Sequence, residues 1–334
     1  MIFSEFEIQI FNEWYFLFLL LSAGAIVGLY FTLRKSSPRV QFIVLFSLLA
    51  LGFLLHFVKM FIPPYADYTD GFHITERGWR DSWFVNICGA NIALFMFFFL
   101  TKNKYLYDYM FYIGVISGAI ALFYPEEPMA KGDAIEQSAQ ILDILRFYYH
   151  HWMLLAVPLL TVLLKRHRLS YKRIWVAPVG LLLLMLFIVL NQIFQSELGF
   201  IPLRDGDGAD GLNVIVPNYK NTSYIWGPLE ISYGSDGPKV VMSDIGQILS
   251  YCCPNCFKFM RVPVLDGGTV TEYITIAKYW PWFWLIVPVF TIVTPISFGL
   301  VMIFDHKAFL QNFKSLFGKT KVFFKSKIKH KPKK

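Results

Sequence analysis

Long apolar windows alternate with short polar connections along most of the chain. Seven windows hold roughly 20 predominantly apolar residues each, which is the length that an α-helix needs to cross a bilayer. Their approximate limits are 14–33, 40–62, 83–101, 105–124, 144–164, 174–195 and 280–304. This pattern predicts an all-α polytopic membrane protein with about seven transmembrane helices. Because the stretch before the first window is acidic and amphipathic rather than basic, we expect that window to stay in the mature chain and not to be a cleaved signal.

The charges of the connections alternate in step with the windows. Lys and Arg gather after the first, third, fifth and seventh windows, whereas the connections 63–82 and 125–143 carry more acidic than basic residues. The positive-inside rule then predicts that the N-terminus lies outside and the C-terminus in the cytoplasm. We therefore expect a multi-pass protein of the cell membrane.

The sixth connection, 196–279, is too long for a simple loop and too polar to be buried. Short runs such as "NVIVPNY", "PKVVM", "RVPVL" and "TVTEYITI", separated by Gly, Pro and Asp, predict strands. The expected organisation is a six-span core (1–195), a small β-rich extracytoplasmic insert (196–279), a seventh span (280–304) and a basic tail (305–334). The insert is a candidate surface for an extracytoplasmic protein partner or a substrate gate.

Two motifs in the insert resemble metal sites. The first, "DGDGADG" at 205–211, lacks an oxygen ligand at its fifth position, Ala209, so a Gly-rich turn is favoured over a calcium loop. The second contains Cys252, Cys253 and Cys256, but a structural zinc site needs four ligands and the sequence offers no second pair. Outside the membrane a disulfide within this cluster is favoured, with zinc as the alternative.

Composition supports a membrane protein, since 56% of the residues are hydrophobic and only 16% are charged. The net charge of +8 comes from the end of the chain: residues 306–334 hold ten lysines and no acid, and without those lysines the charge is −2. The lysines alternate with aromatic and aliphatic residues at roughly helical spacing, which favours anionic lipids rather than nucleic acid as the partner of the tail. A solvated tail that only fixes topology is the alternative.

Uncharged polar residues lie at a common depth in four predicted helices. At 1.5 Å per residue, Cys88 is about 7 Å, His151 about 10 Å, His56 about 9 Å and Asn191 about 5 Å below the outer surface, with His150 beside His151. Polar groups in hydrocarbon tend to face a cavity or each other, so the four helices predict a polar slab under the outer surface. The cytoplasmic halves show no comparable set. The alternative is that each residue only reaches water or satisfies a neighbour.

The slab favours thiol chemistry, because its nearest carboxylates, Asp81 and Asp143, are expected only at the rim. A deprotonated cysteine is a strong nucleophile, an imidazole can take its proton, and an amide can donate to an oxyanion. Helical spacing puts Asn91 on the face of Cys88, whereas Asn86 points elsewhere. Asn191 can approach from another helix. A thiolate at this depth would meet phospholipid ester carbonyls, so the natural reaction is acyl transfer through a thioester.

Four stretches carry a resemblance to a known family. They are "ICGANIALFMFFFLTKNKYLYDYMFYIGVISGAIALFYPEE", "RFYYHHWMLLAVPLL", "LNQIFQ" and "YWPWFW". In order and spacing they resemble the YwaF-like integral membrane proteins, which are similar to an animal multispanning protein regarded as a cysteine-dependent phospholipid acyltransferase. The resemblance implies a multispanning fold in which the family's cysteine falls on Cys88 and its histidine on His151, with His150 in place of a serine. Where bacterial members tend to have Pro and His before the cysteine, this chain has Phe84 and Asn86.

Three hypotheses follow for the function. The first is a membrane phospholipid acyltransferase or lipid-remodelling enzyme, with Cys88 as nucleophile and His151 as base and with no metal or cofactor. The second is a transporter or small-molecule receptor that uses the same polar pocket. The third is a non-catalytic scaffold whose insert binds an outside partner. The residues expected to bind the substrate or ligand are Asn86, Asn91, His150, Asn191 and His56.

Overall fold

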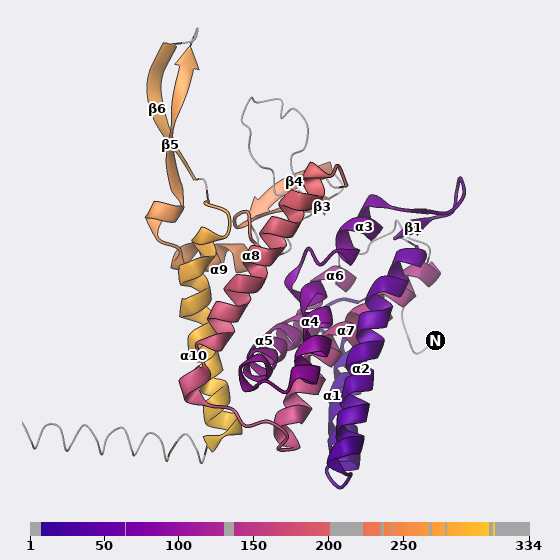
Figure 1. Cartoon of the computed structure of the whole chain (residues 1–334). Helices are drawn as coiled ribbons and strands as arrows, with labels where there is room; N and C mark the ends of the chain where they lie inside the picture. Colours follow the sequence, from indigo (N-terminus) through magenta and orange to yellow (C-terminus); the bar gives the residue numbers. More distant parts are fainter. Residues whose placement is uncertain are drawn as a thin grey trace, which may run out of the picture.

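The computed structural model is a bundle of helices with β-hairpins gathered at one end (Figure 1). It describes residues 8–63, 65–129, 137–200, 223–234, 237–242, 244–266, 269–277, 279–306 and 310. The Gly-rich motif 205–211, the predicted strand "NVIVPNY" and nearly all of the lysine-rich tail lie outside these residues.

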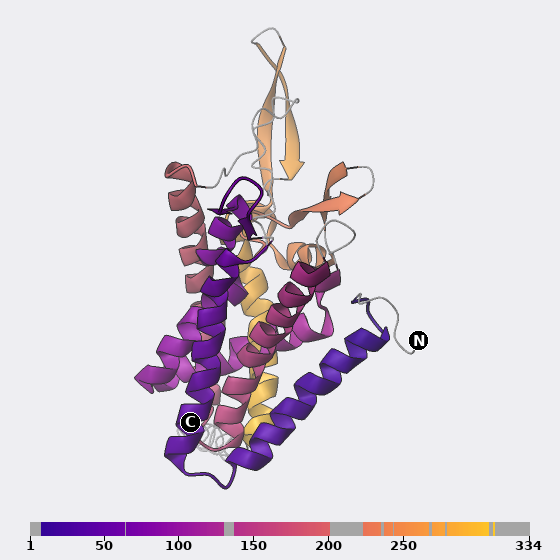
Figure 2. The same cartoon turned by 90° about the vertical axis from the view of Figure 1, so that its right-hand side faces the viewer.

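The helices of the bundle match the predicted windows. They are α1 (Glu13–Leu33), α2 (Pro38–Val58), α4 (Ile87–Thr101), α5 (Lys104–Phe123), α7 (Gln137–Leu163), α8 (Val176–Glu197) and α10 (Ile286–Phe304). Polar caps set several of their starts: the side chains of Asn12, Ser37, Asn86 and Asn103 accept hydrogen bonds from backbone N–H groups in the first turns of α1, α2, α4 and α5. In Figure 2, α1 leans away from the bundle and meets α2 at a short turn.

Five of these segments are long and apolar enough to cross a membrane: Glu13–Leu33, Pro38–Phe61, Lys104–Phe123, Tyr171–Glu197 and Phe283–Phe304. They include the short 3-10 helices η1 (Lys59–Phe61), η2 (Tyr171–Arg173) and η4 (Phe283–Leu285). Helix α4 begins four residues later than the predicted window and spans 15 residues. Helix α7 has 27 residues, but it carries charged and histidine side chains along its first half. The five long apolar helices therefore indicate an integral membrane protein. The third and fifth predicted spans, α4 and α7, do not meet the same criteria of length and apolarity.

Glycines bring α5 and α7 into close contact. A Cβ atom on Gly114 would lie 2.4 Å from the carbonyl oxygen of Leu154, and one on Gly118 would lie 2.8 Å from that of His151. Small residues four positions apart let two membrane helices approach at backbone distance. This contact fixes the height of α7 relative to α5, and with it the position of His151.

The end of the bundle with the hairpins carries the insert. Strands β3 (Leu229–Gly234) and β4 (Gly237–Met242) form one antiparallel hairpin, and β5 (Phe259–Asp266) and β6 (Thr269–Ala277) form another. Three of the predicted strands are thus confirmed, whereas β3 and the helix α9 (Asp244–Cys252) were not expected. The short elements β1 (Ala66–Asp67), β2 (His73–Ile74), α3 (Glu76–Ser82), α6 (Glu126–Met129) and η3 (Asn255–Phe257) complete the described part of the chain.

The cysteine cluster lies at the end of α9 and in η3. Cys252, Cys253 and Cys256 are free thiols, so the favoured disulfide is not formed in this structure. Among the described residues, no group of three or more His, Cys, Asp or Glu side chains is placed to hold a metal ion. The thiols differ in exposure: Cys253 is buried and Cys256 is exposed, and burial raises the pKa of the Cys253 thiol.

Tryptophans dock the insert onto the bundle. The indole N–H of Trp282 donates to the carbonyl oxygen of Leu182 in α8 at 2.8 Å, and that of Trp284 donates to the carbonyl oxygen of Tyr224 at 2.9 Å. Trp226 donates to the side-chain oxygen of Gln192 at 2.6 Å. These bonds join the segment that leads into α10, the start of the described insert and α8.

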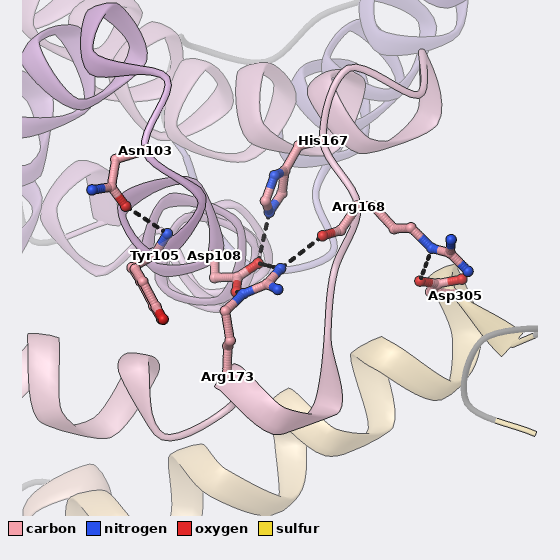
Figure 3. Close-up of polar contacts among 7 residues, drawn as sticks. All are labelled: Asn103, Tyr105, Asp108, His167, Arg168, Arg173 and Asp305. Atoms are coloured by element: carbon pink, nitrogen blue, oxygen red, sulfur yellow. Dashed lines mark hydrogen bonds and ion pairs between the residues drawn. The ribbon is translucent and has the colours of Figure 1, made fainter. Parts of the chain in front are cut away.

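The opposite end of the bundle holds a buried ionic cluster, shown in Figure 3. Asp108 of α5 is fully buried, and its carboxylate accepts from His167 Nε2 at 2.6 Å and from the guanidinium of Arg173. Arg173 also donates to the carbonyl oxygen of Arg168 at 2.9 Å, and Arg168 pairs with Asp305 beyond α10 at 3.1 Å. The carboxylate can be buried here because cations from the following connection neutralise it.

Candidate functional site

The residues before Cys88 form a tight turn that leads into α4. Phe84 has a positive φ of 60°, a conformation that is strained for a bulky side chain. Two residues later, Asn86 caps the helix, and its Oδ1 accepts from the backbone N–H of Gly89 at 2.6 Å. Cys88 thus lies in the first turn of α4, where backbone N–H groups point towards the helix start.

Side chains from other helices hold this turn by its carbonyl oxygens. His56 Nε2 of α2 lies 3.3 Å from the carbonyl oxygen of Ser82, and its ring stacks on Phe84 with centroids 5.1 Å apart. From α8, Asn191 donates to the carbonyl oxygen of Trp83 and Gln192 to that of Val85. The backbone N–H of Ile87 donates to Ser223 Oγ at 3.2 Å. Most of the turn's polar backbone is therefore fixed from outside, as a strained turn requires.

The turn also brings an imidazole to the start of α4. A Cβ atom on Gly89 would lie 3.3 Å from Cε1 of His56, so His56 sits directly over the residue that follows Cys88. Cys88 is half-buried and packs against the hydrophobic core.

One turn deeper, Asn91 is fully buried on the face of Cys88. Its Oδ1 accepts from the hydroxyl of Tyr109 in α5 at 2.9 Å, so the amide nitrogen points the other way. Within the described chain, Asn91 Nδ2 is a buried donor with no hydrogen-bond partner. A buried, unpaired donor is costly, and a bound group that accepts from it would remove that cost.

The two adjacent histidines of α7 have different partners. His150 Nε2 lies 3.1 Å from the carbonyl oxygen of Gly52 and its Nδ1 lies 3.4 Å from Arg146, so Nε2 donates and Nδ1 accepts. His151 Nδ1 lies 2.8 Å from the carbonyl oxygen of Phe147 and therefore donates, which leaves the ring's lone pair on Nε2. This is the tautomer in which an imidazole can accept a proton through Nε2. Helices α4 and α7 pack against each other.

A charged network continues from His150 towards the N-terminal end of α7. Asp143 is buried, although it was expected at the rim of the slab, because Arg146 and Tyr65 enclose it. Its Oδ1 accepts from Arg146 Nε at 2.8 Å and from the Tyr65 hydroxyl at 3.0 Å. Lys59 is also buried and donates to the carbonyl oxygen of Asp81 at 3.3 Å.

Comparison with known proteins assigns the chain to a family. The TMEM164 family matches residues 6–219, which is well over half of the 334 residues. The chain belongs to the TMEM164 family. No curated protein and no solved structure matches it. The TMEM164 match includes α1 to α8, and therefore every predicted site residue, but it ends before the hairpins and α10.

The TMEM164 region thus brings some predicted residues together and gives others a different setting. His56, Asn86 and Asn191 all bind the turn before Cys88. His150 belongs to the network of Arg146, and its ring centroid lies 6.3 Å from that of His56.

Residues of this arrangement that were not expected include Gln192, Ser223 and Arg146. Gln192 is adjacent to Asn191 in "LNQIFQ", and a second amide at the same depth was the available signal. Ser223 carried no signal, because it lies in the long insert far from the predicted slab.

Proposed function

We propose that this TMEM164-family protein transfers acyl groups between phospholipids at the outer leaflet, through a thioester on Cys88. The proposal rests on the way in which the surrounding residues hold the Cys88 thiol in place. A strained turn, held by side chains from two other helices, places Cys88 in the first turn of α4. Backbone strain that is held in place from several sides is typical of functional sites.

The proposed topology has seven spans with the N-terminus outside. Besides the five apolar helices, α4 and α7 would cross the bilayer inside the bundle, where their polar side chains have protein partners. At 15 residues, α4 is about 22 Å long, shorter than a hydrocarbon core of about 30 Å. The turn before it would therefore lie below the outer surface, at the depth of ester carbonyls.

In the proposed reaction, Cys88 Sγ attacks the carbonyl carbon of a phospholipid ester. The thiol proton passes to His151 Nε2 and then to the glycerol oxygen, which leaves as a lysophospholipid when its bond to the carbonyl carbon breaks. A lysophospholipid hydroxyl then attacks the thioester, gives its proton to His151 and releases Cys88 with the proton restored. Asn91 Nδ2 is the proposed donor to the oxyanion, because it is the buried amide donor without a partner in the described chain.

The roles of the other two histidines differ in this proposal. His56 is a positioning residue, since it holds the Ser82 carbonyl and stacks on Phe84. Both ring nitrogens of His150 have partners, so it is not proposed as the base.

Mass spectrometry of the purified full chain tests the proposal. After incubation with dioleoyl phosphatidylethanolamine vesicles, an oleoyl adduct is expected on the peptide that carries Cys88, labile to hydroxylamine as a thioester is. The adduct should vanish in Cys88→Ala and form far more slowly in His151→Gln. Cys256→Ser is the matched control, because it removes an exposed thiol outside the site. If Cys88 stays unmodified, or Cys256 is acylated equally, the proposal is wrong.

A further inference from the structure

Helix α9 carries an apolar stripe that the described part of the protein covers only along one edge. Ile245, Ile248, Leu249 and Cys252 follow the spacing i, i+3, i+4, i+7 and therefore lie on one side of the helix. Leu249 packs against the hydrophobic core, whereas Ile245 and Ile248 are exposed, Ile248 to 56%. Exposed apolar residues in such an arrangement mark a surface that binds another apolar surface.

Contacts on another side of α9 fix its orientation. A Cβ atom on Gly246 would lie 2.2 Å from the carbonyl oxygen of Pro228, so the helix backbone rests directly on that residue. Ser250 Oγ and the hydroxyl of Tyr279 form a hydrogen bond at 2.7 Å. Because these contacts set the rotation of α9 about its axis, the exposure of Ile248 is imposed by the fold.

Helix α9 lies beside the start of a membrane-spanning segment. It packs against α10, and Figure 1 shows it next to the end of α10 from which the hairpin of β5 and β6 rises away from the bundle. The segment Phe283–Phe304 is long and apolar enough to cross a membrane, so its first residue marks one boundary of the hydrocarbon region. The helix α9 is therefore close to the level at which lipid headgroups meet acyl chains.

Exposed aromatic residues occupy the segment between the contact at Tyr279 and the first turns of α10. Trp280 is 50% exposed and Phe283 is 49% exposed, and Phe290 of α10 is exposed as well. Aromatic side chains at the end of a membrane span are typical of the membrane–water interface. Exposed apolar side chains thus occur on α9, on the segment that enters α10 and on α10 itself, and acyl chains are the apolar surface that covers α10.

We propose that α9 is an interfacial helix, with Ile245 and Ile248 inserted at the boundary of headgroups and acyl chains of the phospholipids around the start of α10. A helix that lies in this plane has an apolar side in the lipid and a polar side in water. Gln247 and Tyr251 lie away from the apolar stripe, and Gln247 Nε2 donates to the Tyr251 hydroxyl at 3.3 Å. The proposal goes beyond acyl transfer, because this contact does not require Cys88.

The interfacial contact would fix the insert relative to the lipid surface. The Tyr279 ring, which α9 contacts through Ser250, lies 5.1 Å from the ring of Trp284, and the Trp284 indole donates to the carbonyl oxygen of Tyr224. The preceding residue, Ser223, accepts from the first backbone N–H of α4. A short series of contacts therefore joins α9 to the helix that carries the thiol.

Photo-crosslinking of the full chain in vesicles of palmitoyl-oleoyl phosphatidylcholine tests this proposal. The photoreactive residue p-benzoylphenylalanine replaces one residue at a time. On irradiation, the chain with this residue at Ile248 should gain the mass of one phospholipid. The same replacement at Gln247 is the matched control and should give no lipid adduct, because this neighbour lies on the polar side. Both results should persist in Cys88→Ala, so a failure of the acyl-transfer proposal would leave them unchanged.

Two further positions complete the test. Ile245 should behave like Ile248, since both belong to the stripe. Leu183 is the positive control, because it is exposed on α8 within a segment that is apolar enough to cross a membrane. The proposal is wrong if Leu183 gives a lipid adduct while Ile245 and Ile248 give none. It is also wrong if Gln247 gives as much adduct as Ile248, or if Ile248 crosslinks to another protein chain instead of lipid.

Discussion

Replacing Asp108 should destabilise the protein more than replacing any other single charge in Figure 3, because this carboxylate is fully buried between two cationic or proton-donating side chains. It joins α5 to the connection between α7 and α8. Asp305, in the same figure, offers a matched control. Both pairs join an arginine Nε to an aspartate Oδ2, but Arg168, the partner of Asp305, is 72% exposed.

The size of the effect follows from the number of bonds that the carboxylate accepts. Asp108 Oδ1 accepts from His167 at 2.6 Å and from Arg173 Nη2 at 3.3 Å, and Oδ2 accepts from Arg173 Nε. Asp108→Asn keeps one acceptor oxygen and turns the other into a donor that faces a cation, which should cost about 2–3 kcal/mol. Asp108→Ala leaves the cations with no acceptor and should cost about 3–5 kcal/mol. Asp305→Asn should cost less than about 1 kcal/mol.

Thermal unfolding in detergent, followed by the loss of the monodisperse peak in size-exclusion chromatography, measures this order. The melting temperature should fall in the order Asp305→Asn, Asp108→Asn, Asp108→Ala. Adding Arg173→Met to Asp108→Asn should recover part of the loss, because the uncompensated cation is then removed. The reasoning is refuted if Asp108→Asn melts with Asp305→Asn, or if the effects of Asp108→Asn and Arg173→Met simply add.

Two further predictions use matched pairs. Gly118→Ala should lower the melting temperature, because its Cβ would lie 2.8 Å from a backbone oxygen. Gly28→Ala has no atom within 4 Å of its Cβ and should keep or slightly raise the melting temperature, since Ala is more favourable than Gly in a helix by about 1 kcal/mol. Equal melting temperatures of the two variants in the same unfolding assay would contradict this prediction. For the insert, chains with Cys253 or Cys256 as the single cysteine should react with a membrane-impermeant maleimide at different rates. Burial raises the pKa of Cys253, so less thiolate is present near pH 7 and its labelling should be slower, with a gap that narrows towards about pH 9; equal rates near pH 7 would contradict the assignment.

The apolar windows predicted the helices well because burial in lipid imposes one requirement on every residue of a span. The rule placed the starts of α4 and α7 less accurately. Residues 83–86 are apolar enough to extend the window, yet the strain at Phe84 and the cap at Asn86 start the helix at Ile87. In α7, charged residues reduce the apolarity of a segment that is nevertheless helical, because Asp143 and Arg146 neutralise each other inside the protein.

The insert and the ionic cluster show what local patterns do not contain. Short runs rich in β-branched residues and bounded by Gly, Pro and Asp predicted β4, β5 and β6. Helix α9 was missed, although Ile245, Ile248 and Leu249 have helical spacing, because the short segment was interpreted as part of a β-rich region. In the sequence, Asp108 is recognisable only as an acidic residue near the start of the window 105–124. Its role depends on a contact with Arg173, which follows 65 residues later in the chain, and the sequence pattern does not specify that contact.

The polar slab therefore has a different meaning in the structure than in the sequence. Counting residues from the helix ends predicted that His56 and Asn191 lie at about the depth of Cys88, but it did not show what they bind. Both act on backbone carbonyl oxygens of the turn before α4. A phenylalanine keeps a φ of 60° only where the surrounding structure holds its backbone in that conformation, and these hydrogen bonds hold it. Replacing His56 or Asn191 should then displace Cys88 before it removes any chemical group, which is why the nucleophile and the residues that position it need separate tests.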